Sequence, residues 1–223
     1  MGLGRRINGA GVIQGRGSGE VVKLQSCDIV FLLDESGSME IHEEQAKREF
    51  NHFVQEQAKV ESATRMTLGL FSDDFNVIKN LVPIQEIPRL DSENYFPDGC
   101  TKLLDAIGQS IEDTIAAQIS RPTERSDRTL FVILSDGQEN GSWRFSREFV
   151  RSMIRRARNF FGWEFVVIAI GQADASEIAQ DLGIDERFAL SAGDHVAGAF
   201  EAISRATRDY RRDGEIRLLG SGR

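Results

Sequence analysis

The residues best suited to chemistry are oxygen-bearing side chains that follow an apolar run. Asp34, Ser36 and Ser38 occupy alternate positions directly after residues 29–33, which read Ile-Val-Phe-Leu-Leu. Their side chains can converge only where the loop curls, and Gly37 permits that curl. Ligands that are all oxygen favour a hard divalent cation, Mg²⁺ above all. This stretch therefore predicts a metal site at the end of a buried strand.

Two more oxygen donors stand at comparable places. Asp136 follows the apolar run 129–134, and Thr101 opens a helical pattern that continues to residue 119. Open α/β sheets bind their ligands at the carboxyl ends of the strands, so we expect these donors to share one edge of the sheet. The candidate metal ligands are Asp34, Ser36, Ser38, Thr101 and Asp136.

Strand patterns alternate with helix patterns along most of the chain, as a parallel sheet covered on both faces requires. The two strands nearest in sequence are close enough to form an antiparallel hairpin. We therefore predict an α/β fold: a doubly wound, mostly parallel six-stranded sheet with one antiparallel edge strand and helices on both faces. The predicted strands begin at Cys27 and lie at 66–71, 75–78, 129–134, 164–170 and 186–190, and the helices lie at 40–60, 101–119, 145–161, after Asp174 and at 195–210, with 80–99 as loop.

The two ends of the chain differ in composition from its middle. Residues 1–26 form a basic, Gly-rich arm, which we interpret as flexible or as a hairpin with a turn at Asn8-Gly9. Residues 27–212 form the folded domain, and residues 213–223 read as a flexible tail.

Overall composition excludes several classes of protein. The net charge of −8 argues against a general nucleic-acid binder. No apolar run is long enough to span a membrane, and no signal-peptide core precedes residue 27. Cys27 begins the first predicted strand, and we expect Cys100 in a loop near the far end of that strand. The length of the strand separates the two residues by roughly 20 Å, which is too far for a disulfide. Two free thiols suit a reducing cytosol, so we expect a cytoplasmic protein.

The order of these donors resembles a known site. Asp-x-Ser-x-Ser after the first strand, Gly99-Cys100-Thr101 before a helix and Ser135-Asp136-Gly137 after a later strand resemble the metal-ion-dependent adhesion site (MIDAS) of the von Willebrand factor A (vWA) domain. The resemblance covers about residues 27–210, so residues 27–212 are interpreted as a vWA domain. Cys100, where the family usually has a second glycine, and Ser135, where threonine is common, remove no ligand.

The resemblance implies a role for each candidate residue. Ser36, Ser38 and Thr101 would contact Mg²⁺ or Mn²⁺ through their hydroxyls, and Asp34 and Asp136 would stand behind metal-bound waters. One coordination position would remain for an Asp or Glu of a partner protein. Neutral hydroxyls leave the charge of the cation largely uncancelled, which suits capture of an external carboxylate.

The resemblance also suggests a setting. Many bacterial, phage and archaeal vWA proteins are little more than one such domain, and their intracellular members often work beside AAA+ ATPases, kinases or phosphatases. We expect a non-catalytic adaptor whose partner is an AAA+ ATPase or another operon-encoded protein, and neither a membrane nor a nucleic acid.

Two other functions stay open. One is an enzyme that uses the same metal for phosphoryl transfer or hydrolysis. Against it, a phospho-aspartyl phosphatase would need an aspartate where Ser36 stands, and a receiver-type site would need a lysine beyond Lys102, the last in the chain. The other is a structural subunit of a larger assembly, docked by strand addition of the N-terminal arm.

Several residues around the site have a functional and a simpler interpretation. Five acids form either an electrostatic collar or ordinary turns: Glu35, Asp73, Asp74, Asp98 and Glu139. Trp143 and Phe145 either anchor a partner or pack at a helix start. Two groups of arginines form either solvated helix faces or a docking stripe for an acidic partner: Arg151, Arg155, Arg156 and Arg158, and Arg205, Arg208, Arg211 and Arg212.

Overall fold

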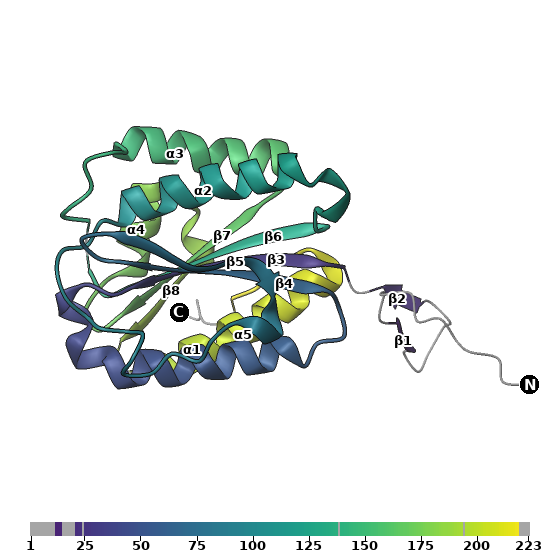
Figure 1. The fold of residues 1–223 in the computed structure, drawn as a ribbon, viewed down its shortest axis with the longest axis horizontal. Coiled ribbons are helices and arrows are strands. Elements are labelled where there is room, and N and C mark those ends of the chain that lie inside the picture. The colour runs from purple at the N-terminus through teal and green to yellow at the C-terminus, as the bar shows by residue number, and fades with distance from the viewer. Residues whose placement is uncertain (1–11, 15–20, 24, 138, 194, 219–223) are drawn as a thin grey trace, which may run out of the picture.

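A computed structural model describes residues 12–14, 21–23, 25–137, 139–193 and 195–218. Its main sheet has the strand order β5-β4-β3-β6-β7-β8, in which only β5 is antiparallel to its neighbour (Figure 1). This confirms the predicted doubly wound α/β fold. The strands are β3 (Cys27–Asp34), β4 (Thr64–Phe71), β5 (Phe75–Pro83), β6 (Arg128–Ser135), β7 (Glu164–Ile170) and β8 (Ala189–Gly193).

The strand β3 lies at the centre of the sheet and is buried along its whole length. Apolar residues on both of its faces explain this position, because helices cover a parallel sheet on each side. It pairs in register with β4 and β6, which places Asp34 opposite Phe71 and brings Leu33 beside Leu134. The carboxyl end of β3 therefore lies beside those of its neighbours.

Helices cover both faces of the sheet (Figure 1). One face carries α1 (Glu43–Ala58) and α5 (Val196–Asp213), and the other carries α2 (Leu103–Ser120), α3 (Arg147–Arg156) and α4 (Ala175–Leu182). Shorter helical turns connect these elements: η1 (Gly37–His42), η2 (Ile84–Glu86), η3 (Pro122–Glu124), the π-helical turn η4 (Ala157–Phe161) and η5 (Glu186–Phe188). A helix begins after Asp174 as predicted, and Asp174 caps it, since its side chain accepts from the Ser176 amide.

Several element boundaries differ from the sequence prediction, and three of these differences have a clear physical reason. The strand β5 continues to Pro83 rather than ending at residue 78, so the predicted 80–99 loop is wrong at its start. Most residues of this edge strand are exposed, which removes the alternation of polarity that marks a strand. The last strand spans 189–193 rather than 186–190, because residues 186–188 form η5 behind the Asp185 cap. The helix predicted at 145–161 is α-helical only over α3 and then turns π-helical.

The described part of the N-terminal arm forms a small sheet of its own. The strands β1 (Val12–Gln14) and β2 (Val21–Lys23) pair antiparallel. The predicted Asn8-Gly9 turn lies outside the described residues. The domain boundaries at 27 and 212 and docking by the arm stay predictions.

Two further findings concern the helices. Arg211 lies neither on a solvated helix face nor on a docking stripe, the two interpretations given to it, because its side chain is fully buried against the end of α1. Both interpretations are therefore wrong for this residue. Among the described residues, no helix has the length and apolarity needed to cross a bilayer.

Candidate metal centre

The carboxyl end of β3 brings four of the five predicted ligands into one hydrogen-bonded chain. The Ser36 amide donates to Asp34 Oδ1 at 2.8 Å, and the hydroxyls of Ser36 and Ser38 lie 3.2 Å apart. The Ser38 hydroxyl donates to Asp136 Oδ1 at 2.7 Å. Asp34 and Ser36 are buried and Ser38 is exposed, so the chain of donors runs from the interior to the surface.

Backbone contacts place Thr101, the fifth predicted ligand, beside this chain. The Thr101 amide donates to Asn140 Oδ1 at 2.8 Å, and the Asn140 amide donates to the Thr101 carbonyl at 3.1 Å. These bonds join the start of α2 to the loop that carries Asp136. On the other side, the Gly37 amide donates to the Gly99 carbonyl at 3.1 Å, which joins the Thr101 loop to the one after β3.

Asp34 is the most strongly perturbed acid of the site. Burial raises its pKa to about 6, hydrogen bonds from Ser135 and Ser36 oppose that rise, and the charge of Asp136 adds to it. The Ser135 hydroxyl donates to Asp34 Oδ2 at 2.5 Å, and the Tyr95 hydroxyl donates to the Asp34 carbonyl at 2.7 Å. A cation here would offset both the burial of this carboxylate and its proximity to Asp136.

The donor set combines hydroxyls with only two carboxylates. Within the residues that the structure describes, no group of three His, Cys, Asp or Glu side chains could hold a metal ion. Mg²⁺ and Mn²⁺ accept oxygen from hydroxyl, carboxylate and water alike, so the donor chemistry fits either ion.

Gly99, rather than Gly37, is the glycine whose conformation the site requires. Its φ of +79° lies in the left-handed region, and a Cβ there would meet Asp73 Oδ2 at 2.6 Å. A Cβ on Gly37 would make only ordinary contacts, with the Gly99 carbonyl at 3.6 Å. The expectation that the loop curls because of Gly37 is therefore not supported.

The surrounding acids mainly hold the loops in place. Glu139 accepts from the amides of Leu104, Gly141 and Ser142, at 2.9, 2.9 and 2.6 Å. Three other acids also accept from backbone amides: Asp73 from Cys100 at 3.1 Å, Glu35 from Phe96 at 2.6 Å and Asp98 from Gly99 at 2.8 Å. These bonds favour the interpretation as turn acids over that of a free electrostatic collar.

Sequence reasoning missed the structural roles of three residues next to the site. Ser135 binds Asp34, Asn140 binds Thr101, and Glu139 caps the start of α2. The only local signal was the polar run after β6, since the partners of these side chains lie far away in sequence. The two aromatic residues after this loop differ. Trp143 is 82% exposed, as an anchor for a partner would be, whereas Phe145 packs against Gly108 of α2.

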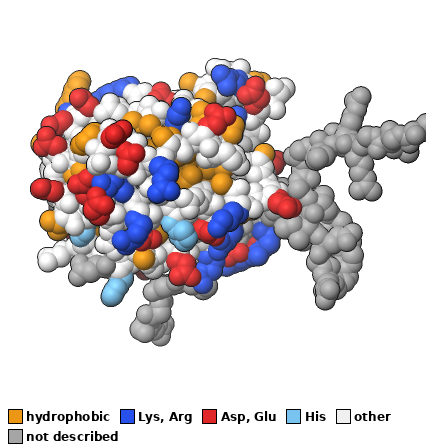
Figure 2. Space-filling view, turned by 60° about the horizontal axis from the view of Figure 1, so that its bottom comes forward, with side chains coloured by type: hydrophobic (Ala, Val, Ile, Leu, Met, Phe, Trp, Pro, Cys, Tyr) orange, Lys and Arg blue, Asp and Glu red, His pale blue; other side chains and the backbone are white. Residues whose placement is uncertain are grey.

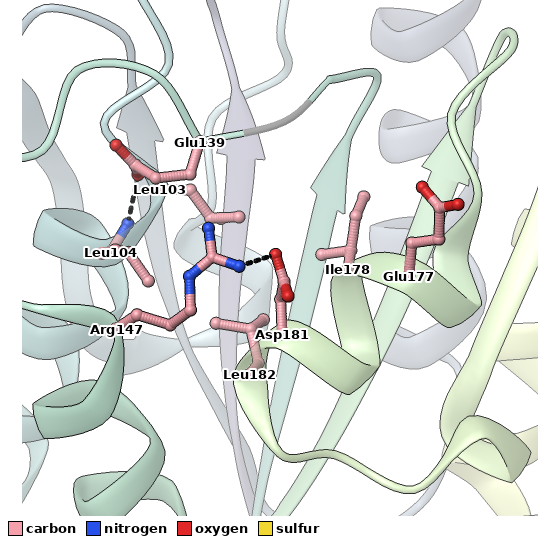
Figure 3. A pocket seen from close by; sticks show the side chains of 8 residues that line it. All are labelled: Leu103, Leu104, Glu139, Arg147, Glu177, Ile178, Asp181 and Leu182. Carbon is pink, nitrogen blue, oxygen red and sulfur yellow. Dashed lines mark hydrogen bonds and ion pairs between the residues drawn. The ribbon is translucent and has the colours of Figure 1, made fainter.

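A small cavity lies beside this loop, where the first turns of α2 and α3 meet α4 (Figure 3). Glu139 reaches it from the site, and an ion pair between Arg147 and Asp181 crosses it (Figure 3). Its volume of about 30 Å³ holds roughly one water molecule, which is too little for an organic ligand. None of the five candidate metal ligands lines this cavity, and the candidate site reaches the surface at the exposed Ser38.

Comparison with known families identifies the domain. The family described as von Willebrand factor type A domain matches residues 28–201. The chain belongs to this family. The match spans β3 to the first turns of α5 and includes all five candidate ligands of the vWA domain. A search of curated proteins finds no match.

Solved structures share the vWA fold at low sequence identity. The vWF domain of the type V pili tip protein Mfa5 from Porphyromonas gingivalis has a TM-score of 0.64 and 13% identity, over 86% of this chain and 98% of that chain. Manganese-loaded TRAP protein from Plasmodium vivax has a TM-score of 0.59 and 18% identity, over 81% and 73%. Proximal thread matrix protein 1 from the mussel byssus, with a zinc-occupied MIDAS motif, has a TM-score of 0.54 and 18% identity, over 85% and 46%. This chain therefore spans just under half the length of the mussel protein.

Proposed function

We propose that this vWA domain is a non-catalytic protein-interaction module that captures an Asp or Glu of a partner through Mg²⁺ or Mn²⁺. The observation that supports it most is the continuous chain of oxygen donors from Asp34 through Ser36 and Ser38 to Asp136. The Thr101 amide donates to the Asn140 side chain, in the loop that carries Asp136. In this proposal the five residues form one binding site at the carboxyl edge of the sheet.

The chemistry of the donors suggests a role for each of the five residues. Ser36, Ser38 and Thr101 would supply neutral hydroxyls, and the two aspartates would supply the negative charge. A bound cation would attract an external carboxylate, because the neutral ligands would not cancel the charge of the cation. The exposed hydroxyl of Ser38 marks the side from which a partner would approach.

The choice of metal and the setting are also proposals. The manganese in the Plasmodium protein and the zinc in the mussel protein support a divalent cation in this fold. The free thiols of Cys27 and Cys100 are compatible with a cytoplasmic setting. We propose an operon-encoded partner there, such as an AAA+ ATPase. Catalysis is not part of the proposal, since Ser36 stands where a phospho-aspartyl enzyme needs a second acid.

Mn²⁺ binding by calorimetry tests the site directly. Ser36→Ala and Thr101→Ala should each weaken binding by at least about tenfold, whereas Ser176→Ala, at an exposed serine of α4, should not. Partner capture should need Mg²⁺ or Mn²⁺ and be lost with EDTA. Metal uptake that both site variants leave intact would contradict the proposed ligands, and metal-independent capture would contradict the proposed function.

A further inference from the structure

Side chains of α2, α3 and η4 line a groove. The helices α2 and α3 lie on the face of the sheet away from α1 and α5 (Figure 1). Its volume is about 450 Å³, and most of the side chains that line it are apolar. From α2 it is lined by Ile111, Ile115 and Glu112, and from α3 and η4 by Phe149, Met153 and Phe160. The Glu112 carboxylate is already paired with Arg144 at 2.9 Å. Phe149 and Phe160 are 53% and 77% exposed, an unusual state for phenylalanine in a folded chain.

The π-helical turn that ends α3 keeps one phenylalanine outside. Within η4, Phe161 turns inward and its ring lies 5.3 Å from that of the buried Trp163. The adjacent Phe160 points to solvent. On α2, Ile119 is 70% exposed, one turn beyond Ile115. The groove therefore continues into an exposed apolar strip along both helices.

The helix α3 and the turn η4 are rich in arginine. Residues 147–161 contain five arginines and one acid, Glu148, in a chain whose net charge is −8. Arg147 pairs with Asp181, and Arg158 pairs with Glu164. The others are Arg151, Arg155 and Arg156, none of which has a carboxylate within ion-pair distance among the described residues. Of these, Arg156 lines the groove, whereas Arg151 lies against Gly183 at the end of α4.

The opposite face of the molecule carries charges of both signs. Acidic and basic side chains are interspersed on the face that α1 and α5 cover (Figure 2). Glu56 of α1 pairs there with Arg208 of α5. On the α2–α3 face, by contrast, Arg156 and the exposed Phe160 line one groove, and Arg156 has no carboxylate within ion-pair distance among the described residues.

We propose that the groove between α2 and α3 docks an amphipathic helix of a partner protein, with an apolar face and flanks that carry Asp or Glu. The distance along α3 and η4 from Phe149 to Phe160 is roughly 16 Å, or three helical turns. A helix laid along it could insert apolar side chains at i, i+4 and i+7 between the two existing helices. Its acidic flank would then meet Arg156, which lines the groove.

Two synthetic peptides test this surface. Both have 18 residues and leucines at i, i+4, i+7 and i+11, and they carry flanking glutamates in one case and flanking lysines in the other. Fluorescence anisotropy with the full chain should show at least tenfold tighter binding of the Glu peptide, unchanged by EDTA. Independence from EDTA separates this surface from the metal centre, so either proposal can fail alone.

Three variants locate the binding surface. Phe160→Ser should weaken binding of the Glu peptide at least tenfold, whereas Phe96→Ser, at a phenylalanine that is 59% exposed elsewhere, should not. Arg156→Glu should reverse the preference toward the Lys peptide, which a loss of folding would not do. Equal binding of both peptides, or no effect of Phe160→Ser, would overturn the proposal. So would self-association of the chain that Phe160→Ser abolishes, because a second copy would then be the occupant.

Discussion

The Ser135 hydroxyl donates a 2.5 Å hydrogen bond to Asp34 Oδ2, across 101 residues of sequence. Both side chains are fully buried at the junction of β3 and β6. Ser135 is the last residue of β6 and directly precedes Asp136, so one short segment both orients the first aspartate and supplies the second. The parallel pairing of these strands is what builds the candidate metal centre.

Ser135→Ala should weaken Mn²⁺ binding although it removes no predicted ligand. The loss of a partner that orients a metal-binding carboxylate typically lowers metal affinity about tenfold to a hundredfold. Ser135→Thr keeps the hydroxyl and should bind Mn²⁺ nearly as tightly as the natural chain. Calorimetric titration of the three proteins decides between them, and equal affinities would show that Asp34 needs no support from Ser135.

The sequence predicts the centre of this fold better than its edges. The run before Asp34 is apolar on both faces, which marks a central parallel strand, and polar residues end it abruptly. The strand β5 borders solvent, so it lacks the alternation of polar and apolar residues that would have extended the predicted strand to Pro83. Hydrogen-bond partners that are distant in sequence are harder still to predict. No local pattern shows that Ser135 would bind Asp34 or that Asn140 would bind Thr101, because tertiary structure creates those contacts.

Arg211 shows how residue type can mislead when position is informative. It lies four residues after the buried Thr207, on the inward stripe of α5, yet a charged side chain suggests the solvated face. The structure satisfies its guanidinium with carbonyls, including those of Gln57 and Ser62 at 3.1 Å each. The helical spacing from Thr207 therefore predicts the burial of Arg211 better than its charge does.

Arg211→Ala should lower the free energy of unfolding by at least about 3 kcal/mol, because it leaves several buried carbonyls without donors. Arg212→Ala, at the next and half-exposed residue, should change it by no more than about 0.5 kcal/mol. Urea denaturation followed by circular dichroism measures both. Similar losses for the two variants would mean that these buried bonds contribute little.

Gly99→Ala should cost about 1–3 kcal/mol, because alanine at a φ of +79° is strained and its Cβ would collide with the Asp73 carboxylate. Gly37→Ala should change stability by no more than about 0.5 kcal/mol, since its Cβ would make only ordinary van der Waals contacts. Thermal unfolding of the pair gives the comparison. A larger loss at Gly37 than at Gly99 would contradict the proposed geometry of these loops.

Cys27 should be inert toward thiol reagents in the folded chain. Burial raises the pKa of its thiol from 9.0 to about 12, whereas Cys100 is exposed. A colorimetric disulfide reagent at pH 8 should label one thiol in the native protein and two in urea, and Cys100→Ser should abolish the native reaction. Rapid labelling of both thiols in the native protein would show that β3 opens readily.

The same shift in pKa gives a pH dependence of stability. The unfolded thiol ionises above pH 9 while the folded thiol stays protonated, so the contribution of Cys27 is complete below pH 9 and is lost between pH 9 and about 12. The free energy of unfolding should therefore fall from pH 8.5 to 10, and should fall less steeply in Cys27→Ala. Urea titrations at these two pH values measure the difference, and parallel declines in both proteins would show that the thiol of Cys27 does not control alkaline stability.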